Sequence, residues 1–212
     1  SAFSTWTVDA HYNWTDTSTV GTSTITFTIG GNTSGYRFNV TTDGGVFTNG
    51  IVNASGQAVF TMLGSDPVVD VVVLSPCGAA RYWVGGTGTW SQVFHWAPAS
   101  GGTGGCPVPT ASNPVFFDGN SGNGTVTVDQ NVALASLDTT AWTGTLALGT
   151  FDFIVSGNVT HASGIITIGG SSNSGLAISG SLTLSGSAVL DGSGVPSAVR
   201  VSGNTLISSA TA

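Results

Sequence analysis

The chain has 212 residues and a formal net charge of −7, with no lysine or glutamate and only three arginines, Arg37, Arg81 and Arg200. Because nucleic acids and anionic membranes attract clustered basic side chains, we expect neither as a partner. Charged residues make up 6% of the chain and hydrophobic residues 40%, so the sequence predicts a folded core rather than disorder.

The N-terminal segment from Trp6 to Trp14 alternates apolar and polar residues, which predicts a long strand with one buried face. Two interpretations are open. The segment is the first strand of its own sheet, or it is a donor strand that completes the sheet of an adjoining subunit through main-chain hydrogen bonds. In the donor-strand interpretation, the apolar face of the segment is a subunit interface, formed by Trp6, Val8, Ala10, Tyr12 and Trp14.

Residues 1–78 are expected to form a β-sandwich. The same alternation recurs around Phe27 and Phe38, and two further apolar runs, Val59–Leu63 and Val68–Leu74, precede Cys77. Glycine pairs at 30–31 and 44–45 separate the earlier runs. Six or seven short strands at this spacing are typical of a sandwich.

Two runs, GYRFNVTTDGGVF at 35–47 and IVNASGQAVFTML at 51–63, carry a resemblance to known proteins. They resemble the bacterial Ig-like domains of invasin- and intimin-type surface proteins. Those domains have a glycine turn followed by an A-x-G-x-A element, at whose places Ala54, Gly56 and Ala58 stand here. The resemblance implies an Ig-like sandwich that serves as a spacer or adhesive module and is not an enzyme.

Residues 79–118 change character, and we expect them to form a Gly- and Trp-rich junction between two architectures. The run RYWVGGTGTWSQVFHWAPASGGTGGCPVPTASNPVFFD at 81–118 resembles a W-V-G-G-x-G-x-W…H-W element of large bacterial cell-surface proteins and phage structural proteins. In those proteins it precedes repetitive β-rich sequence. Trp83, Trp90 and Trp96 either plug the junction, which we favour, or stack on sugars. For His95 we favour a structural role over that of a catalytic base.

Cys77 and Cys106 are the only cysteines, and we expect them to form one disulfide that stabilises the fold by about 3 kcal/mol. The sequence starts at Ser1 and its only methionine is Met62. We therefore expect that a signal peptide has been removed and that the protein is extracellular or on the cell surface, with a virion as the alternative.

In the C-terminal region, residues 119–212, the stretch from Ile154 to Leu206 repeats at a spacing of 23 residues. Val155-Ser156-Gly157-Asn158 recurs as 178–181 and as 201–204. This period predicts a short right-handed parallel β-helix, a solenoid that stacks Val155, Ile178 and Val201 in one inward column and leaves its last coil as an open sheet edge. Further expected pairs are Ile166 with Val189 and Leu184 with Ile207. The expected inward residues are Val126, Val128, Leu146, Leu148, Phe151, Phe153, Ile166 and Ile168.

No catalytic or metal-binding pattern is present in the sequence, and we expect no cofactor. The solenoid aspartates, Asp129, Asp138, Asp152 and Asp191, are scattered and off the repeat register, as turn formers would be. His11, His95 and His161 lack the spacing of metal ligands. Candidate N-glycosylation sequons begin at Asn13, Asn32, Asn39, Asn53, Asn123 and Asn158.

Together these patterns predict an all-β, non-enzymatic, extracellular structural subunit. We expect it to assemble with itself, head to tail, into a surface filament or pilus-like fibre, or to serve as an adhesin stalk that also contacts surface glycans. Two alternatives stay open: a phage virion protein, such as a tail fibre or capsid decoration, and a secreted carbohydrate-binding module.

Overall fold

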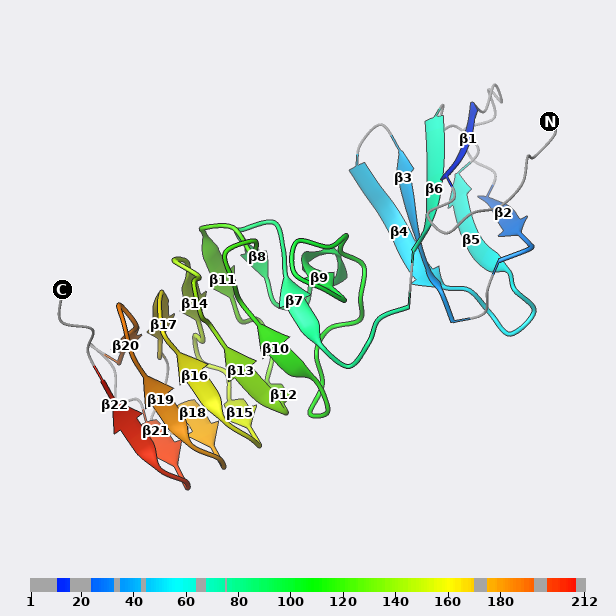
Figure 1. Ribbon diagram of the computed structural model, residues 1–212. Helices are drawn as coiled ribbons and strands as arrows, with labels where there is room; N and C mark the ends of the chain where they lie inside the picture. Colours follow the sequence, from blue (N-terminus) through cyan, green and yellow to red (C-terminus); the bar gives the residue numbers. More distant parts are fainter. Residues whose placement is uncertain are drawn as a thin grey trace. The chain divides into compact units, whose positions relative to one another are not determined.

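The computed structural model describes residues 11–15, 24–32, 35–42, 45–63, 68–74, 76–169, 175–192 and 198–208. The chain divides into two compact units, residues 1–77 and 78–212, and both consist of β-strands (Figure 1). Within the described residues the only helical segment is a single 3₁₀ turn, η1 (Val93–His95). The prediction of an all-β protein is confirmed.

Unit 1 contains two antiparallel sheets that share one core. The first has the order β1-β6-β3-β4 and the second pairs β2 with β5. Their bounds are β1 His11–Thr15, β2 Thr24–Ile29, β3 Arg37–Thr42, β4 Gly45–Ile51, β5 Ala58–Leu63 and β6 Val68–Leu74. Phe38 of the first sheet faces Phe60 of the second, with ring centroids 6.1 Å apart. The predicted strands are present, and the Ig-like assignment remains a prediction.

The turn before β5 explains the A-x-G-x-A element of the sequence. The side-chain Oδ1 of Asn53 accepts hydrogen bonds from the backbone N–H groups of Ser55 (2.9 Å) and Gln57 (3.0 Å). Gly56 has a φ of +72°, and a Cβ there would lie 2.5 Å from the carbonyl oxygen of Asn32. Glycine is therefore required by both backbone conformation and space.

Unit 2 is a β-solenoid of about four turns, built from three ladders of short parallel strands. One face has the order β22-β19-β16-β13-β10-β7-β9, the second β20-β17-β14-β11-β8 and the third β12-β15-β18-β21 (Figure 1). The strands of the first face are β7 Arg81–Trp83, β9 Trp96–Ala97, β10 Pro114–Phe116, β13 Ser136–Asp138, β16 Val159–His161, β19 Leu182–Leu184 and β22 Thr205–Ile207. Those of the second are β8 Gly88–Thr89, β11 Thr125–Thr127, β14 Thr145–Ala147, β17 Ile165–Thr167 and β20 Val189–Asp191. Those of the third are β12 Val132–Leu134, β15 Phe153–Val155, β18 Gly175–Ile178 and β21 Ala198–Val201.

The register confirms the predicted column of Val155, Ile178 and Val201, which are successive partners in the third face. Leu184 pairs with Ile207 as expected. The prediction for Ile166 was wrong by one residue, since Ile165 pairs with Val189 and Ile166 with Leu190. The expected inward residues are buried apart from Phe151, which is half-buried.

The repeated Ser-Gly-Asn or Ser-Gly-Ser corner has a packing cause. Gly157, Gly180 and Gly203 stack at successive coils. The N–H of Gly180 donates to the carbonyl of Gly157 (3.1 Å), and the N–H of Gly203 donates to the carbonyl of Gly180 (3.0 Å). A Cβ on Gly180 would overlap the carbonyl oxygen of Gly157, and one on Gly203 would lie 2.6 Å from that of Gly180. The next residue continues the stack, because the Ser181 N–H donates to Asn158 Oδ1 at 2.9 Å. The close approach of the backbone therefore requires glycine at this corner in each repeat.

The boundary of the solenoid differs from the prediction of a separate junction at 79–118. β10 pairs in parallel with β7, and β11 pairs in parallel with β8. The segment thus forms the first coil of unit 2 instead of a linker. Its glycines and tryptophans obscured the two-residue alternation, and the longer first coil does not follow the 23-residue period.

We predict that Gly180→Ala destabilises unit 2 by about 1–3 kcal/mol, since the added methyl group meets backbone atoms that cannot move aside as a side chain can. Gly78→Ala is the matched control, because a Cβ at Gly78 has nothing within 4 Å. Chemical denaturation of both variants measures the difference. Equal stabilities would contradict the stacked-corner explanation.

Candidate functional site

The two ends of the solenoid differ, and the N-terminal end is closed by an aromatic core. Trp83, Trp90 and Trp96 are each fully buried. Trp96 meets Trp83 edge to face at 5.0 Å and Trp90 at 4.7 Å between ring centroids. Phe117 joins Trp83 to Trp142 of the following coil, at 5.9 and 4.5 Å. This end of the solenoid is therefore filled by interlocking rings.

Backbone pairing covers the same end. β9 lies antiparallel on β7, so the first parallel strand of this face has a partner on both sides. The Cys106 N–H then donates to the Trp96 carbonyl at 2.8 Å and the Gly105 N–H to the Val93 carbonyl at 3.0 Å. Arg81 closes the loop further by donating from Nε to the Pro107 carbonyl (3.0 Å) and from Nη1 to the Gly78 carbonyl. The Cys77–Cys106 disulfide, predicted from the sequence, is present.

The glycines of the Trp-Val-Gly-Gly motif make room for His95. The imidazole stacks on Trp83 with centroids 4.5 Å apart and planes 7° apart, and its Nδ1 lies 2.6 Å from the Val84 carbonyl oxygen. A Cβ at Gly88 would overlap His95 Nε2, and one at Gly85 would lie 2.9 Å from Nδ1. This geometry agrees with the structural role favoured for His95.

The structure agrees with neither role expected for the three tryptophans. Sugar-stacking platforms need exposed rings, and Trp83, Trp90 and Trp96 have no exposed surface. The rings they contact all belong to unit 2, so they plug the first coil of the solenoid and not a junction between architectures.

A buried histidine links three successive coils in the middle of the solenoid. His161 Nε2 lies 2.9 Å from the Val189 carbonyl oxygen, and Nδ1 lies 2.6 Å from the Thr139 hydroxyl. Because a carbonyl only accepts, Nε2 carries the proton of the neutral ring and Nδ1 accepts from Thr139. Burial lowers the pKa of His161, and the hydrogen bond to Val189 opposes this in part. No sequence pattern indicates this contact, because it depends on the register of three coils.

The described part of the solenoid ends with β20, β21 and β22. In the part of the chain that the structure describes, no strand pairs with the outer edge of β20, β21 or β22. The inward columns run out into solvent here: the column from His161 ends at Ile207, which is 72% exposed, and the column from Phe153 ends at Val199, 41% exposed. On the outer surface of β22, Leu206 is 59% exposed. Apolar side chains and unpaired backbone groups therefore coincide.

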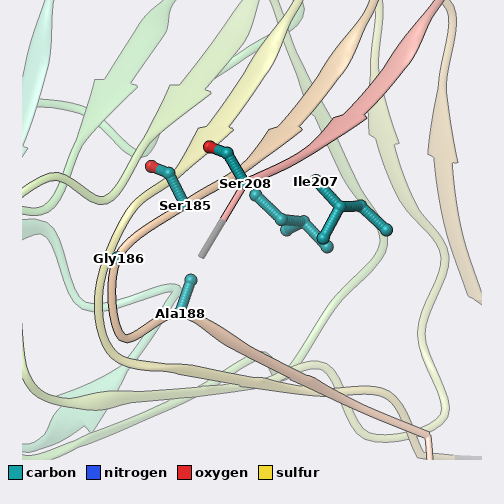
Figure 2. A pocket seen from close by; sticks show the side chains of 6 residues that line it. Ser185, Gly186, Ala188, Ile207 and Ser208 are labelled. Carbon is teal, nitrogen blue, oxygen red and sulfur yellow. The ribbon is translucent and has the colours of Figure 1, made fainter. Parts of the chain in front are cut away.

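A cavity of about 130 Å³ lies at this end (Figure 2). It is formed between the corner after β19 and the last strand, β22. Its walls are small or apolar: Leu184, Ser185, Gly186, Ala188, Ile207 and Ser208. Two coils earlier, in the corner after β13, the corresponding space is filled by Trp142, whose Nε1 donates to the Gly122 carbonyl at 2.8 Å. The core thus changes from aromatic and filled at one end to aliphatic and incompletely filled at the other.

The proposed donor strand is only partly covered by the described residues. Trp6, Val8 and Ala10 lie outside them. Tyr12 and Trp14 lie in β1, which pairs antiparallel with β6 of the same chain, Tyr12 opposite Val71 and Trp14 opposite Val69. The edge of β6 is thus a place where this segment fits, whichever copy supplies it.

The six candidate glycosylation sites differ in accessibility. Asn39, 8% exposed, is buried in β3, so the folded chain does not present it to a glycosylating enzyme. Asn53, Asn123 and Asn158 are exposed, and Asn32 is half-buried. The side chain of Asn13 lies outside the described residues.

The solenoid aspartates do not converge. Asp138 Oδ1 accepts from the Thr140 N–H at 2.8 Å, and Asp129 accepts from the N–H of Ser91 at 3.1 Å. These are turn and loop contacts, as expected. Among the described residues no group of three His, Cys, Asp or Glu side chains gathers that would hold a metal ion. A search of the same residues finds no helix long and apolar enough to cross a membrane.

Comparison of the chain with family models, curated proteins and solved structures finds no match. The structure alone therefore defines its class: an all-β chain with a β-solenoid unit of about four turns.

The burial of His161 predicts how the free energy of unfolding depends on pH. Since its pKa in the folded state is lowered from 6.5, the unfolded chain binds the proton more readily. The contribution of His161 is therefore complete above about pH 6.5 and is lost as the pH falls from there toward the folded-state pKa. His161→Gln should weaken the decline of unfolding free energy between pH 7.5 and 5. Identical slopes for the variant and the wild type would contradict this.

Proposed function

We propose that this chain is a non-enzymatic structural subunit that assembles with copies of itself outside the cell. The observation that carries the proposal is the last described coil, where the outer edges of β20, β21 and β22 have no strand partner among the described residues and two inward apolar columns end in exposed side chains. A coil of a solenoid buries its apolar side chains only against a neighbouring coil. A second copy supplies that neighbour.

The exposed area has the composition of a contact surface. Leu206 and Ile207 lie on β22, and Val199 lies on β21 of the neighbouring face. Ile207 also lines the cavity, together with Ala188 (Figure 2) and Leu184. Covering apolar surface yields roughly 25 cal/mol per Å², and pairing the edges satisfies backbone donors and acceptors. The closed, aromatic end offers no comparable edge in its first face, since β9 already covers β7.

A filament needs a second contact, and unit 1 supplies a candidate. If the segment that contains β1 leaves its own β6 and pairs with the β6 of another copy, the same hydrogen-bond register is kept between two chains. Such a head-to-tail exchange does not close on itself. Together with a contact at the open end, it builds a surface filament or a stalk.

The chemistry of the chain supports an extracellular setting. Both cysteines are oxidised in one disulfide, which oxidising compartments permit. Exposed asparagines in three sequons are available to a glycosylating host.

The test is the oligomeric state of the full chain over a range of concentrations, measured by sedimentation velocity and electron microscopy. We expect the wild type to assemble and Ile207→Lys to weaken assembly by at least about tenfold, because the charge is placed on the apolar end of the solenoid.

Ile154→Lys is the matched control. Ile154 is 46% exposed on β15, in the middle of the solenoid, so the same change there should leave assembly intact. A wild-type chain that stays monomeric at high concentration, with a stable fold, would overturn the proposed function.

A further inference from the structure

The hydrogen bonds around His161 continue beyond the ring and form a chain of four groups. Nε2 of His161 lies 2.9 Å from the Val189 carbonyl oxygen, and Nδ1 lies 2.6 Å from Thr139 Oγ1. Thr139 Oγ1 lies in turn 3.2 Å from the carbonyl oxygen of Ser163, in the corner after β16. His161 and Thr139 have no exposed surface, so the chain of hydrogen bonds is closed to bulk water at its centre.

The Thr139 hydroxyl has one hydrogen and two acceptors within reach. While the ring is neutral, Nε2 carries its proton and donates to Val189, so the hydroxyl donates to Nδ1. The Ser163 carbonyl oxygen then receives no hydrogen bond from Thr139. A hydroxyl oxygen also accepts, so the same oxygen can receive a hydrogen bond from Nδ1 of a protonated ring. Its own hydrogen then has the Ser163 carbonyl oxygen as its acceptor, and every donor in the chain keeps a partner.

The described groups that face the ring are neutral. In the same and the neighbouring coils, β15, β17, β18 and β19 contain no charged residue, whereas β13 contains Asp138 and β20 contains Asp191. Asp138 follows the buried Leu137, so strand alternation places it on the outer surface. Asp191 follows Leu190, which pairs with the buried Ile166, so it lies on the outer surface too. Carbonyl and hydroxyl dipoles are therefore what a charge on the ring would meet.

We propose that Thr139 and the Ser163 carbonyl form a relay that lets His161 take up a proton inside the folded solenoid. On protonation, the hydrogen bond between Thr139 and His161 reverses: Nδ1–H donates to Thr139 Oγ1, and the hydroxyl turns to donate to Ser163. One proton is taken from solvent, and no covalent bond between heavy atoms forms or breaks. The charge is held by two carbonyl dipoles, one directly at Val189 and one through Thr139. Thr139 is thus a positioning residue for the proton.

The relay is a device for acid tolerance. A buried neutral histidine that must become charged is one of the usual causes of acid unfolding. Without an acceptor at Nδ1, the added proton would leave a charged donor unpaired in the core, and the coils would have to separate to hydrate it. With the relay, unit 2 stays folded while His161 is protonated, and the stability lost on acidification levels off once the folded chain also holds the proton.

Thr139→Val is the direct test, because it replaces the hydroxyl with a methyl group. If Thr139 only packs or only donates to the neutral ring, the variant loses no more free energy of unfolding in acid than at neutral pH. The relay predicts a larger loss in acid, since hydrogen bonds of charged groups are roughly twice as strong as neutral ones. We therefore expect the midpoint of His161 protonation in the folded chain to fall by about 0.5–1 pH unit.

Two variants serve as controls. Thr139→Ser keeps the hydroxyl and should restore the wild-type midpoint. Thr160→Val makes the same change one residue before His161, at a half-buried position whose backbone pairs with Thr183, and should leave the midpoint unchanged.

The measurement is nuclear magnetic resonance of the full chain labelled with ¹⁵N-histidine, titrated from neutral to acid pH. The ring signals report which nitrogen of His161 carries a proton, and the backbone amide signals of unit 2 report folding. We expect a neutral ring protonated on Nε2, and in acid a doubly protonated ring with the folded amide signals retained.

Three results would overturn the relay. The first is a neutral ring protonated on Nδ1, and the second is a wild-type chain that unfolds as His161 takes up its proton. The third is an equal midpoint in the wild type and Thr139→Val. The first two need only the wild type, so they decide the question even if Thr139→Val does not fold.

Discussion

The structure of unit 2 depends on one constraint: a coil cannot bury its own apolar face and must be stacked on another coil. Backbone hydrogen bonds, the glycine corners and the inward columns all connect one coil with the next. Each interior coil is stabilised from two sides. Among the described residues, the first and the last coil each have a neighbouring coil on one side only.

The N-terminal end meets this constraint within the chain. Tryptophans are large enough to fill the space that a missing coil would occupy. Two of the three indole N–H groups have carbonyl partners: Trp83 donates to Gly86 at 2.7 Å and Trp96 to Trp90 at 2.8 Å, whereas Trp90 Nε1 is buried without a hydrogen-bond partner. The Trp-Val-Gly-Gly motif is therefore explained as a packing device. Its glycines admit His95, and His95 in turn covers the face of Trp83.

The C-terminal end does not meet the constraint within the described residues, and the proposed function follows from that difference. Its side chains are aliphatic, its cavity is lined by small residues, and its two charges have opposite sign on different faces. A surface with these properties suits a β-rich partner that repeats its own geometry, and a second copy has that geometry. Because charged residues make up only 6% of the chain, few other charges repel a second copy that approaches this surface.

The all-β class, the described strands of unit 1 and the column of Val155, Ile178 and Val201 could be predicted from the sequence, because two-residue alternation and a constant period are local signals. The disulfide could be predicted because the chain has only two cysteines. The sequence-based prediction began the solenoid too late and shifted the strand partner of Ile166 by one residue, because coils of unequal length break the period. The burial of polar groups such as Asn39 and His161 became visible only in the tertiary structure. The same holds for the placement of Asp191 and Arg200 on neighbouring faces of the last described coil. Those properties depend on which coils and sheets lie next to one another, and no local pattern encodes that.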